Sequence, residues 1–350
     1  MSNNNPIENA HRAVSDNNEA VKKEAATLAY ADWYLQENSD KKSGESAQKY
    51  VEDALKLQGL DTTGLMVFDN GTIITNAPTI PNGFKYLEGT VETGFVIKNS
   101  TDKNEFVWVP VEKGTFYTVD GYSLNWDTGV FELENFVSSD NVYEPYEEEG
   151  YTSEREEYDA MVESVEKYGG FYIARYEASD NGSGKAQSLP NKTPWNNIAW
   201  GTSTVDITGG AVEAARAVYP VSNATVGDAV STLPYGVEWD AVIKFIETNY
   251  PGISQDSLEY GNYSICDKET GEPIYEASMI NTGSNSDYAI NNIYDIAGNL
   301  QEWTMECDGY GRYSRGGNFY DYDFVISSRV GGEAGGYCDY EGFRIALYIK

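Results

Sequence analysis

The first part of the chain shows helical periodicity. Apolar residues recur three and four positions apart over residues 7–36, a spacing that places them on one face of an α-helix. The same spacing predicts a second helix over residues 46–58. Two short apolar runs then flank an Asp-Asn-Gly turn at residues 69–71, where Asn-Gly supplies the positive φ of a tight hairpin. We therefore expect a helical module with a small hairpin over residues 1–77.

After residue 78 the pattern changes to short strands and turns. Two apolar runs around a polar turn over residues 95–111 predict an antiparallel hairpin. The acidic stretch near residues 140–165 is interpreted as a solvated insertion whose later half can form a helix. Apolar residues at helical spacing predict a scaffold helix with a buried face over residues 233–246. The last residues, 345–350, alternate as a strand should, with one set of side chains on each face.

Charge limits the classes of partner. The chain has 56 acidic and 24 basic side chains and a formal net charge of -32, so its surface should repel phosphate backbones and anionic headgroups. We expect no nucleic-acid partner. A run of eighteen apolar residues is absent, and the N-terminal sequence lacks the features of a signal peptide, so the chain as given is expected to be soluble and untargeted.

Residues suited to catalysis are scarce. The three cysteines, Cys266, Cys307 and Cys338, fit neither a zinc knuckle nor a CxxC motif, although a Cys266–Cys307 disulfide is compatible with their spacing. His11 is the single histidine, so a serine nucleophile would have no suitable histidine base. Paired carboxylates are expected by chance in so acidic a chain.

A series of landmarks then follows in a fixed order between residues 169 and 350: GGFYIARYEAS, PWNNIAW, LPYGVEWDAVIKFI, NNIYDIAGNLQEWT, SRGGNF and EGFRIAL. Together they resemble the formylglycine-generating enzyme family, also called the sulfatase-modifying factor domain. That family has a variant of the C-type lectin fold, so the resemblance implies an α+β, C-type lectin-like domain over residues 78–350. The segment AHRAVSDNNEAVKKEAATLAYADWYL resembles the part of type IV pilin-like proteins that follows their membrane helix. It implies a pilin-like module with an upstream helix that this chain lacks; a plain helical appendage is the alternative.

The resemblance also sets expectations for metals. Active family members hold copper with two cysteines after RGG, and the related ergothioneine sulfoxide synthases hold iron with several histidines. Here the segment NFYDYDFVISSRVGG contains no cysteine, so we expect no enzymatic activity and no required cofactor. The family's structural calcium site maps to Asp295, Gly298, Leu300 and Glu302, oxygen donors of the kind calcium prefers. The alternative is that Asp295 and Glu302 cap turns and face water.

Residues 318–340 have the composition of a binding loop. They are rich in Tyr, Phe, Asp, Ser and Gly and contain no Lys, Gln, Met or Trp, much as antibody loops do. With this composition the chain resembles the variable proteins of diversity-generating retroelements, in which rewritten Asn codons cannot encode those residues. The alternative is an ordinary Tyr-rich surface loop. If the segment is the binding loop of a variable protein, Ser327, Ser328 and Arg329 fix the loop, and Arg329 and Arg344 pair with internal carboxylates. Ten residues would then point to solvent and bind ligand: Asn318, Tyr320, Tyr322, Phe324, Val330, Gly332, Tyr337, Cys338, Asp339 and Tyr340.

The sequence thus predicts a non-enzymatic, adhesin-like protein displayed at the cell surface. Its partner would be a protein or glycan on another cell or host surface, and its N-terminal module could support a pilus-like or membrane-tethered assembly. A phage receptor-binding protein in a virion, and an enzyme of the formylglycine-generating oxidase family, are the two alternatives.

Overall fold

The computed structural model describes residues 6–39, 44–112, 120–125, 130–135, 152–203, 208–267, 270, 272–307, 311–321 and 324–350. The chain divides into two compact units, Met1–Thr79 and Ile80–Lys350. The boundary expected from the sequence lies two residues earlier, after residue 77.

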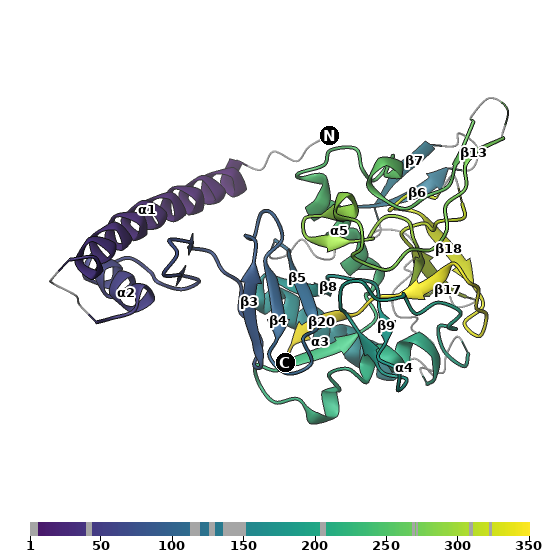
Figure 1. The fold of residues 1–350 in the computed structure, drawn as a ribbon, viewed down its shortest axis with the longest axis horizontal. Coiled ribbons are helices and arrows are strands. Elements are labelled where there is room, and N and C mark those ends of the chain that lie inside the picture. Colours follow the sequence, from purple (N-terminus) through teal and green to yellow (C-terminus); the bar gives the residue numbers. More distant parts are fainter. Residues whose placement is uncertain are drawn as a thin grey trace. The chain divides into compact units, whose positions relative to one another are not determined.

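The N-terminal unit consists of two helices and a hairpin (Figure 1). Helix α1 (Pro6–Glu37) packs on α2 (Ala47–Leu57), and β1 (Met66–Val67) pairs antiparallel with β2 (Ile73–Ile74). Alanines on the buried face of α1 allow close approach of α2, which inserts Val51 and Leu55 into the shared core. The two helices and the hairpin predicted for this module are confirmed. Its pilin-like character stays a prediction.

The C-terminal unit is built on a six-stranded antiparallel sheet in the order β11-β20-β8-β5-β4-β3. The strands are β3 (Phe84–Glu88), β4 (Val96–Asn99), β5 (Glu105–Pro110), β8 (Gly170–Ala174), β11 (Ala229–Thr232) and β20 (Ala346–Ile349). Helix α3 (Thr152–Tyr168) packs on β8 and β20, and α5 (Gly236–Glu247) contacts β5. This coverage explains why both sets of side chains in β20 are buried rather than one.

A second sheet in this unit carries the segments that contain the residues predicted to bind ligand. Its order is β18-β17-β16-β19, from β16 (Gln301–Cys307), β17 (Arg312–Arg315), β18 (Arg329–Gly332) and β19 (Glu341–Phe343). The β16–β19 pair is parallel and the other two pairs are antiparallel. Figure 1 shows β17 and β18 at the end of the unit away from β3 and β4.

Shorter elements complete the description. Strand pairs are β6 (Asp120–Asn125) with β7 (Val130–Asn135), β9 (Ser179–Asp180) with β10 (Ala186–Gln187), β12 (Ile265–Cys266) with β13 (Pro273–Tyr275), and β14 (Ala289–Ile290) with β15 (Ile293–Tyr294). Among the described residues, the remaining helices are α4 (Gly210–Arg216) and the 3-10 turns Val221–Asn223, Leu258–Tyr260 and Ser286–Tyr288.

The α+β class expected from the sequence is confirmed, as is the hairpin over residues 95–111, which is β4 and β5. In the acidic stretch, residues 136–151 lie outside the described part, and the later half belongs to α3 as predicted. The Cys266–Cys307 disulfide does not form: none of the three cysteines is in a disulfide, and Cys307 is enclosed in the core at the end of β16. Among the described helices, none is both long and apolar enough to span a bilayer.

Candidate functional site

The candidate site is built on the segment between β17 and β19. The sequence suggests an irregular segment over residues 318–340, but its middle forms β18, in register with β17 from Arg312↔Gly332 to Arg315↔Arg329. The segment is therefore two loops, one on either side of a strand. Both loops are held to a sheet at each end, which limits how far they can move.

Buried ion pairs hold the first loop in place. Arg315 donates from Nη2 to Asp240 Oδ1 (2.7 Å) and from Nη1 to Glu306 (3.0 Å). Arg329 donates from Nη2 to the other Asp240 oxygen (2.7 Å) and from Nε to Glu306 Oε1 (2.8 Å). Burial raises the pKa of Glu306, but the two guanidinium groups outweigh burial and bring it below its ordinary value. The expectation that Arg329 pairs internally is confirmed.

Gly316 and Gly317, directly after β17, allow close approach of neighbouring backbone and side chains. A Cβ on Gly317 would lie 2.1 Å from the carbonyl oxygen of Phe324, and its φ of +69° is in the left-handed region. The turn that follows is buried: Ser327 Oγ donates to the Ser254 carbonyl (2.6 Å), and Trp239 Nε1 donates to the Ile326 carbonyl (3.0 Å). Ser327 thus fixes the loop, as predicted.

Asn318 does not point to solvent, which corrects the sequence prediction. Its side chain is fully buried. The amide nitrogen donates to Gln301 Oε1 (3.0 Å) and Asp321 Oδ2 (2.9 Å), and the amide oxygen accepts from the backbone N–H of Tyr320 (2.8 Å) and Asp321 (3.0 Å). The residue satisfies its polar groups inside the protein and turns the chain, so that Tyr320 emerges on the surface.

Exposed tyrosines lie on the two loops. Tyr320 is 66% exposed and Tyr337 67% exposed, and Asp339 is exposed as well. The Tyr340 ring is half-buried and stacks on Tyr320, with centroids 6.2 Å apart and planes 14° from parallel. We call Tyr320, Tyr337, Asp339 and Tyr340 the tyrosine face. Of the other predicted ligand-binding residues, Tyr322 lies outside the described residues, and four are half-buried: Phe324, Val330, Gly332 and Cys338.

Cys338 is not suited to thiolate chemistry. Burial, together with Glu341, raises the pKa of its thiol to about 12, so the thiol stays protonated at neutral pH. Its backbone carbonyl accepts from the N–H of Asn197 (3.1 Å), which ties the second loop to the domain.

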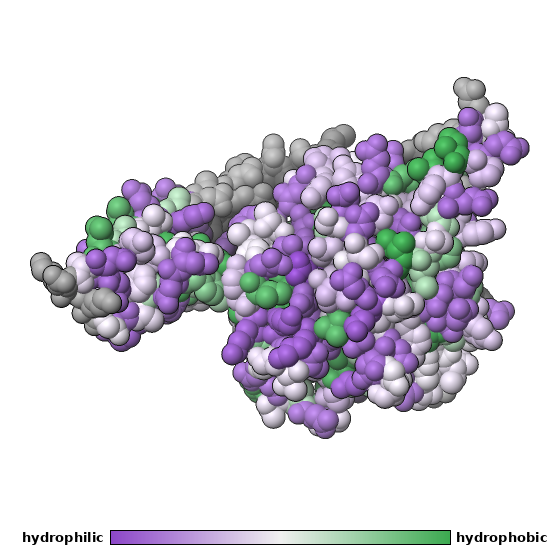
Figure 2. Space-filling view, viewed as in Figure 1, coloured by the Kyte–Doolittle hydropathy of each residue, from purple (hydrophilic) through white to green (hydrophobic). Residues whose placement is uncertain are grey.

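A hairpin that sequence reasoning left unassigned adjoins the tyrosine face. It is formed by β12 and β13 and exposes Ile265, Ile274 and Tyr275. The N–H and Oγ of Ser264 both donate to the carbonyl of Phe319 (3.0 and 2.7 Å), so the hairpin is joined to the residue before Tyr320. Hydrophilic colours dominate Figure 2, and one of its apolar spots lies over the region of β13 in Figure 1. The signal in the sequence was two apolar runs around the polar stretch DKETGE.

The predicted calcium ligands lie in a buried ionic cluster. Arg344 donates from Nε and Nη2 to the two oxygens of Glu302, both at 2.5 Å, which confirms its expected internal pairing. Asp295 Oδ2 accepts from Thr282 and Gly283, whereas its buried Oδ1 has no hydrogen-bond partner in the described part of the chain. Burial raises the pKa of Asp295 and that of Glu302.

This arrangement fits a guanidinium better than calcium at Glu302, because Arg344 already compensates that carboxylate. Neither Asp295 nor Glu302 faces water, so the alternative reading of the two as solvated caps is wrong. Within the described residues no group of three His, Cys, Asp or Glu side chains is arranged to hold a metal. Calcium binding at Asp295, Gly298, Leu300 and Glu302, expected from the resemblance, is left untested by this arrangement, and it would require Arg344 to release Glu302.

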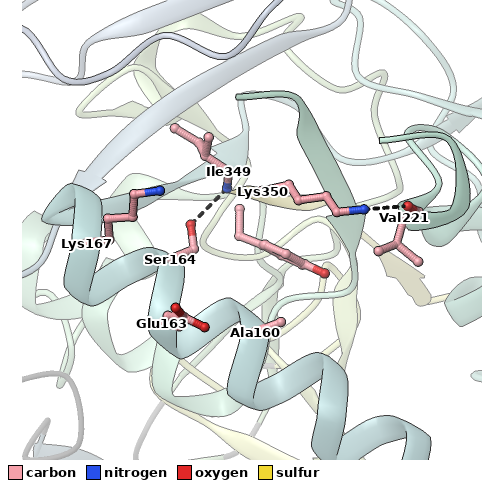
Figure 3. A pocket seen from close by; sticks show the side chains of 8 residues that line it. Ala160, Glu163, Ser164, Lys167, Val221, Ile349 and Lys350 are labelled. Carbon is pink, nitrogen blue, oxygen red and sulfur yellow. Dashed lines mark hydrogen bonds between the residues drawn. The ribbon is translucent and has the colours of Figure 1, made fainter. Parts of the chain in front are cut away.

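A surface pocket elsewhere on this unit has a structural role (Figure 3). It lies between α3 and β20, where Ser164 Oγ accepts from the N–H of Ile349 (2.9 Å) and Lys350 Nζ donates to the Val221 carbonyl (3.4 Å). These contacts anchor the C-terminal strand, so the pocket is not our candidate site.

Comparison with known proteins gives distant likenesses. No family model matches the chain, and no curated protein matches it. Among solved structures, Treponema denticola variable protein 1 is 14% identical with a TM-score of 0.35, covering 76% of this chain and 99% of that one. The crystal structure of CarF is 16% identical with a TM-score of 0.36, covering 52% of this chain and 87% of that one. At these TM-scores neither likeness assigns a fold or a function to the chain.

Proposed function

We propose that this chain is a non-enzymatic binding protein that recognises a protein or glycan on another cell or host surface through the tyrosine face. The observation that carries the proposal is the exposure of Tyr320 and Tyr337 on loops that are otherwise anchored in the core. Aromatic side chains in such positions provide most of the binding energy in protein interfaces.

The loop anchors support the proposal. A loop fixed before binding loses little conformational entropy on forming a complex, so more of the contact energy appears as affinity. The polar side chains of the loop anchors form hydrogen bonds or ion pairs inside the protein; the anchors are Asn318, Ser327, Arg315 and Arg329. The exposed residues between these anchors can therefore change without loss of the fold, as binding loops on rigid scaffolds do.

The finer parts of the proposal extend this reading. We further propose that the tyrosine face belongs to a C-type lectin-like domain that is diversified by a retroelement. The protein would be displayed at the cell surface, and its N-terminal unit would support a pilus-like or membrane-tethered assembly. The composition of residues 318–340 supports diversification. A reverse transcriptase and a near-identical template repeat beside the gene would be expected, and their absence would contradict this part.

A peptide-display selection tests the binding function. The full chain is panned against a random peptide library, and the enriched pool is assayed on the chain and on the Tyr320→Ala/Tyr337→Ala variant. We expect binding to drop at least about tenfold on the variant, as for loss of interface hot spots. Tyr34→Ala is the matched control, because Tyr34 is also an exposed tyrosine but lies on α1. A pool that binds both equally contradicts the proposal, and failure to enrich a pool contradicts recognition of a protein partner.

A further inference from the structure

The aromatic pair of the tyrosine face is suited to a cation. Tyr320 and Tyr340 lie nearly parallel, and Tyr320 offers most of its surface to solvent. The face of a tyrosine ring carries negative potential, and guanidinium and ammonium groups bind against it. Aromatic stacking alone does not distinguish a cation from a sugar, so the charges beside the rings decide.

Two carboxylates border the pair. Asp321 follows Tyr320 in the chain, and Glu341 follows Tyr340. Both act on the Tyr340 hydroxyl, whose pKa is raised to about 12 first by its hydrogen bond with Cys338, then by burial and by the charges of Glu341 and Asp321. Both carboxylates therefore make the potential at Tyr340 more negative.

Neither carboxylate has a compensating charge within the part of the chain that the structure describes. Glu341 is only 8% exposed, yet it accepts from the neutral amide of Gln301 (2.7 Å). Asp321 likewise accepts from the neutral amide of Asn318 (2.9 Å). Burying a carboxylate such as that of Glu341 without a cation is costly, and bringing a positive charge to it is favourable. Asp321, which is half-buried, adds a second negative charge.

Two arginines of the sheet are already paired elsewhere. Arg315 and Arg329 are both committed to Asp240 and Glu306 in the interior. The net charge of -32 adds a long-range attraction for any cationic partner. Among the described residues no cation pairs with Asp321 or Glu341, which leaves both carboxylates to a cationic partner.

We propose that the tyrosine face selects protein partners that present an exposed arginine or lysine, with the cationic group against Tyr320 and Tyr340 and near Asp321 and Glu341. This inference rests on the proposed function and narrows it from a protein or glycan to a protein with a basic side chain at its centre of contact. A neutral glycan would leave Glu341 uncompensated and is the competing outcome of the test.

The test uses the full chain and a fluorescent peptide of alternating glycine and arginine, with a second peptide in which citrulline replaces arginine. Citrulline keeps the shape and most hydrogen-bond donors but removes the charge. Fluorescence anisotropy at about 0.15 M salt limits long-range effects. We expect the citrulline peptide to bind at least about tenfold more weakly. Equal binding of the two peptides, or failure of the arginine peptide to bind, overturns the inference.

Variants separate the face from the general acidity of the chain. Asp321→Asn/Glu341→Gln should weaken arginine-peptide binding about tenfold, and Tyr320→Ala about fivefold, whereas Tyr320→Phe keeps the ring and should retain binding. Glu163→Gln/Glu259→Gln removes the same number of charges from exposed sites elsewhere, and binding should stay within about twofold. Unfolding midpoints confirm that each variant is folded. Equal weakening by both double variants overturns the inference.

The two proposals can fail separately. Peptides selected by display that require Tyr320 and Tyr337 but contain no enrichment in arginine or lysine would leave the binding function standing and refute the preference for a cation.

Discussion

Arg315 and Arg329 lie directly opposite each other on β17 and β18 and share the same two carboxylates, Asp240 and Glu306. Like charges in this position are unfavourable by themselves. Here Asp240 and Glu306 each form an ion pair with both guanidinium groups, so the two negative charges balance the two positive charges inside the protein. The pairing joins α5 and β16 to the strands that flank the first loop, and it is the main reason why that loop is fixed.

Asp240→Asn should be strongly destabilising, because it leaves Arg315 and Arg329 with one carboxylate between them. Removing one partner from a buried ion-pair network costs about 3–5 kcal/mol. We expect that loss in the free energy of unfolding measured with urea. Asp159→Asn is the control: its pair with Arg155 is exposed, and such pairs contribute about 0–1 kcal/mol. Equal effects of the two substitutions would show that the network does not hold the loop.

Asn318→Ala should destabilise the protein by about 1–3 kcal/mol, because buried partners of its amide lose their hydrogen bonds. Faster amide exchange at Tyr320 should accompany the loss, since that N–H is bonded to the Asn318 side chain. Tyr337→Ala removes an exposed side chain and should change stability by no more than about 0.5 kcal/mol. A stability change for Asn318→Ala as small as that control would place Asn318 back on the surface.

Sibling copies of the gene provide a second check on the same residue. If the segment is diversified, positions 320, 337, 339 and 340 should vary, because their side chains are exposed or half-buried. Position 318 should stay Asn, since its side chain has four internal hydrogen bonds. Variation at 318 equal to that at 320 would contradict the assignment of Asn318 as a loop anchor.

Local patterns in the sequence carry information about local structure, and here they predicted α1, α2, the β4–β5 hairpin and α5. They could not place Asn318, because its exposure depends on Gln301, which lies seventeen positions away in the chain. Arg329 and Asp240 are 89 positions apart in the chain. The sequence indicates that Arg329 pairs with an internal carboxylate, but it does not indicate which one. Strand β18 was missed because its glycine-rich sequence has little β-propensity, and pairing with β17 overrides that preference.

A chelator should leave the melting temperature unchanged. Arg344 binds both oxygens of Glu302 in the folded protein, so we expect this ion pair, rather than a metal, to compensate that carboxylate. A ligand that binds the folded state raises its stability, and removing bound calcium would lower the melting temperature. Melting with added calcium and with chelator is the measurement. A lower midpoint in chelator would establish a calcium site at Asp295 and its neighbours.

Alkylation should modify Cys266 first. Cys307 is fully buried, and the raised pKa of the Cys338 thiol, about 12, leaves little thiolate at pH 8. Cys266 lies half-buried on the exposed hairpin. Mass spectrometry after brief treatment with iodoacetamide, without reductant, should find one modified cysteine at position 266. Loss of Cys266 and Cys307 labelling together, even after denaturation, would reveal the disulfide that the structure lacks.

Glu238 should make stability fall as pH rises. It is fully buried on α5, and burial, with a smaller contribution from Glu157, raises its pKa to about 8. Because the folded pKa exceeds the ordinary value near 4.5, the fold favours the protonated acid. Its contribution is complete below pH 4.5 and is lost as the pH rises toward and through 8.

Glu238→Gln isolates this effect. The glutamine carbonyl can still accept from the N–H of Tyr235, as Glu238 Oε2 does at 2.8 Å, but it carries no charge. Relative to the variant, the natural chain should lose several kcal/mol between pH 5 and pH 8.5, of the order of 3–5 from a shift of this size. Urea unfolding at both pH values measures the difference, with exposed Glu163→Gln as the charge-matched control. Parallel stability curves for the natural chain and Glu238→Gln would mean that Glu238 reaches solvent and ionises freely, so that the buried acid does not govern the alkaline limit of the fold.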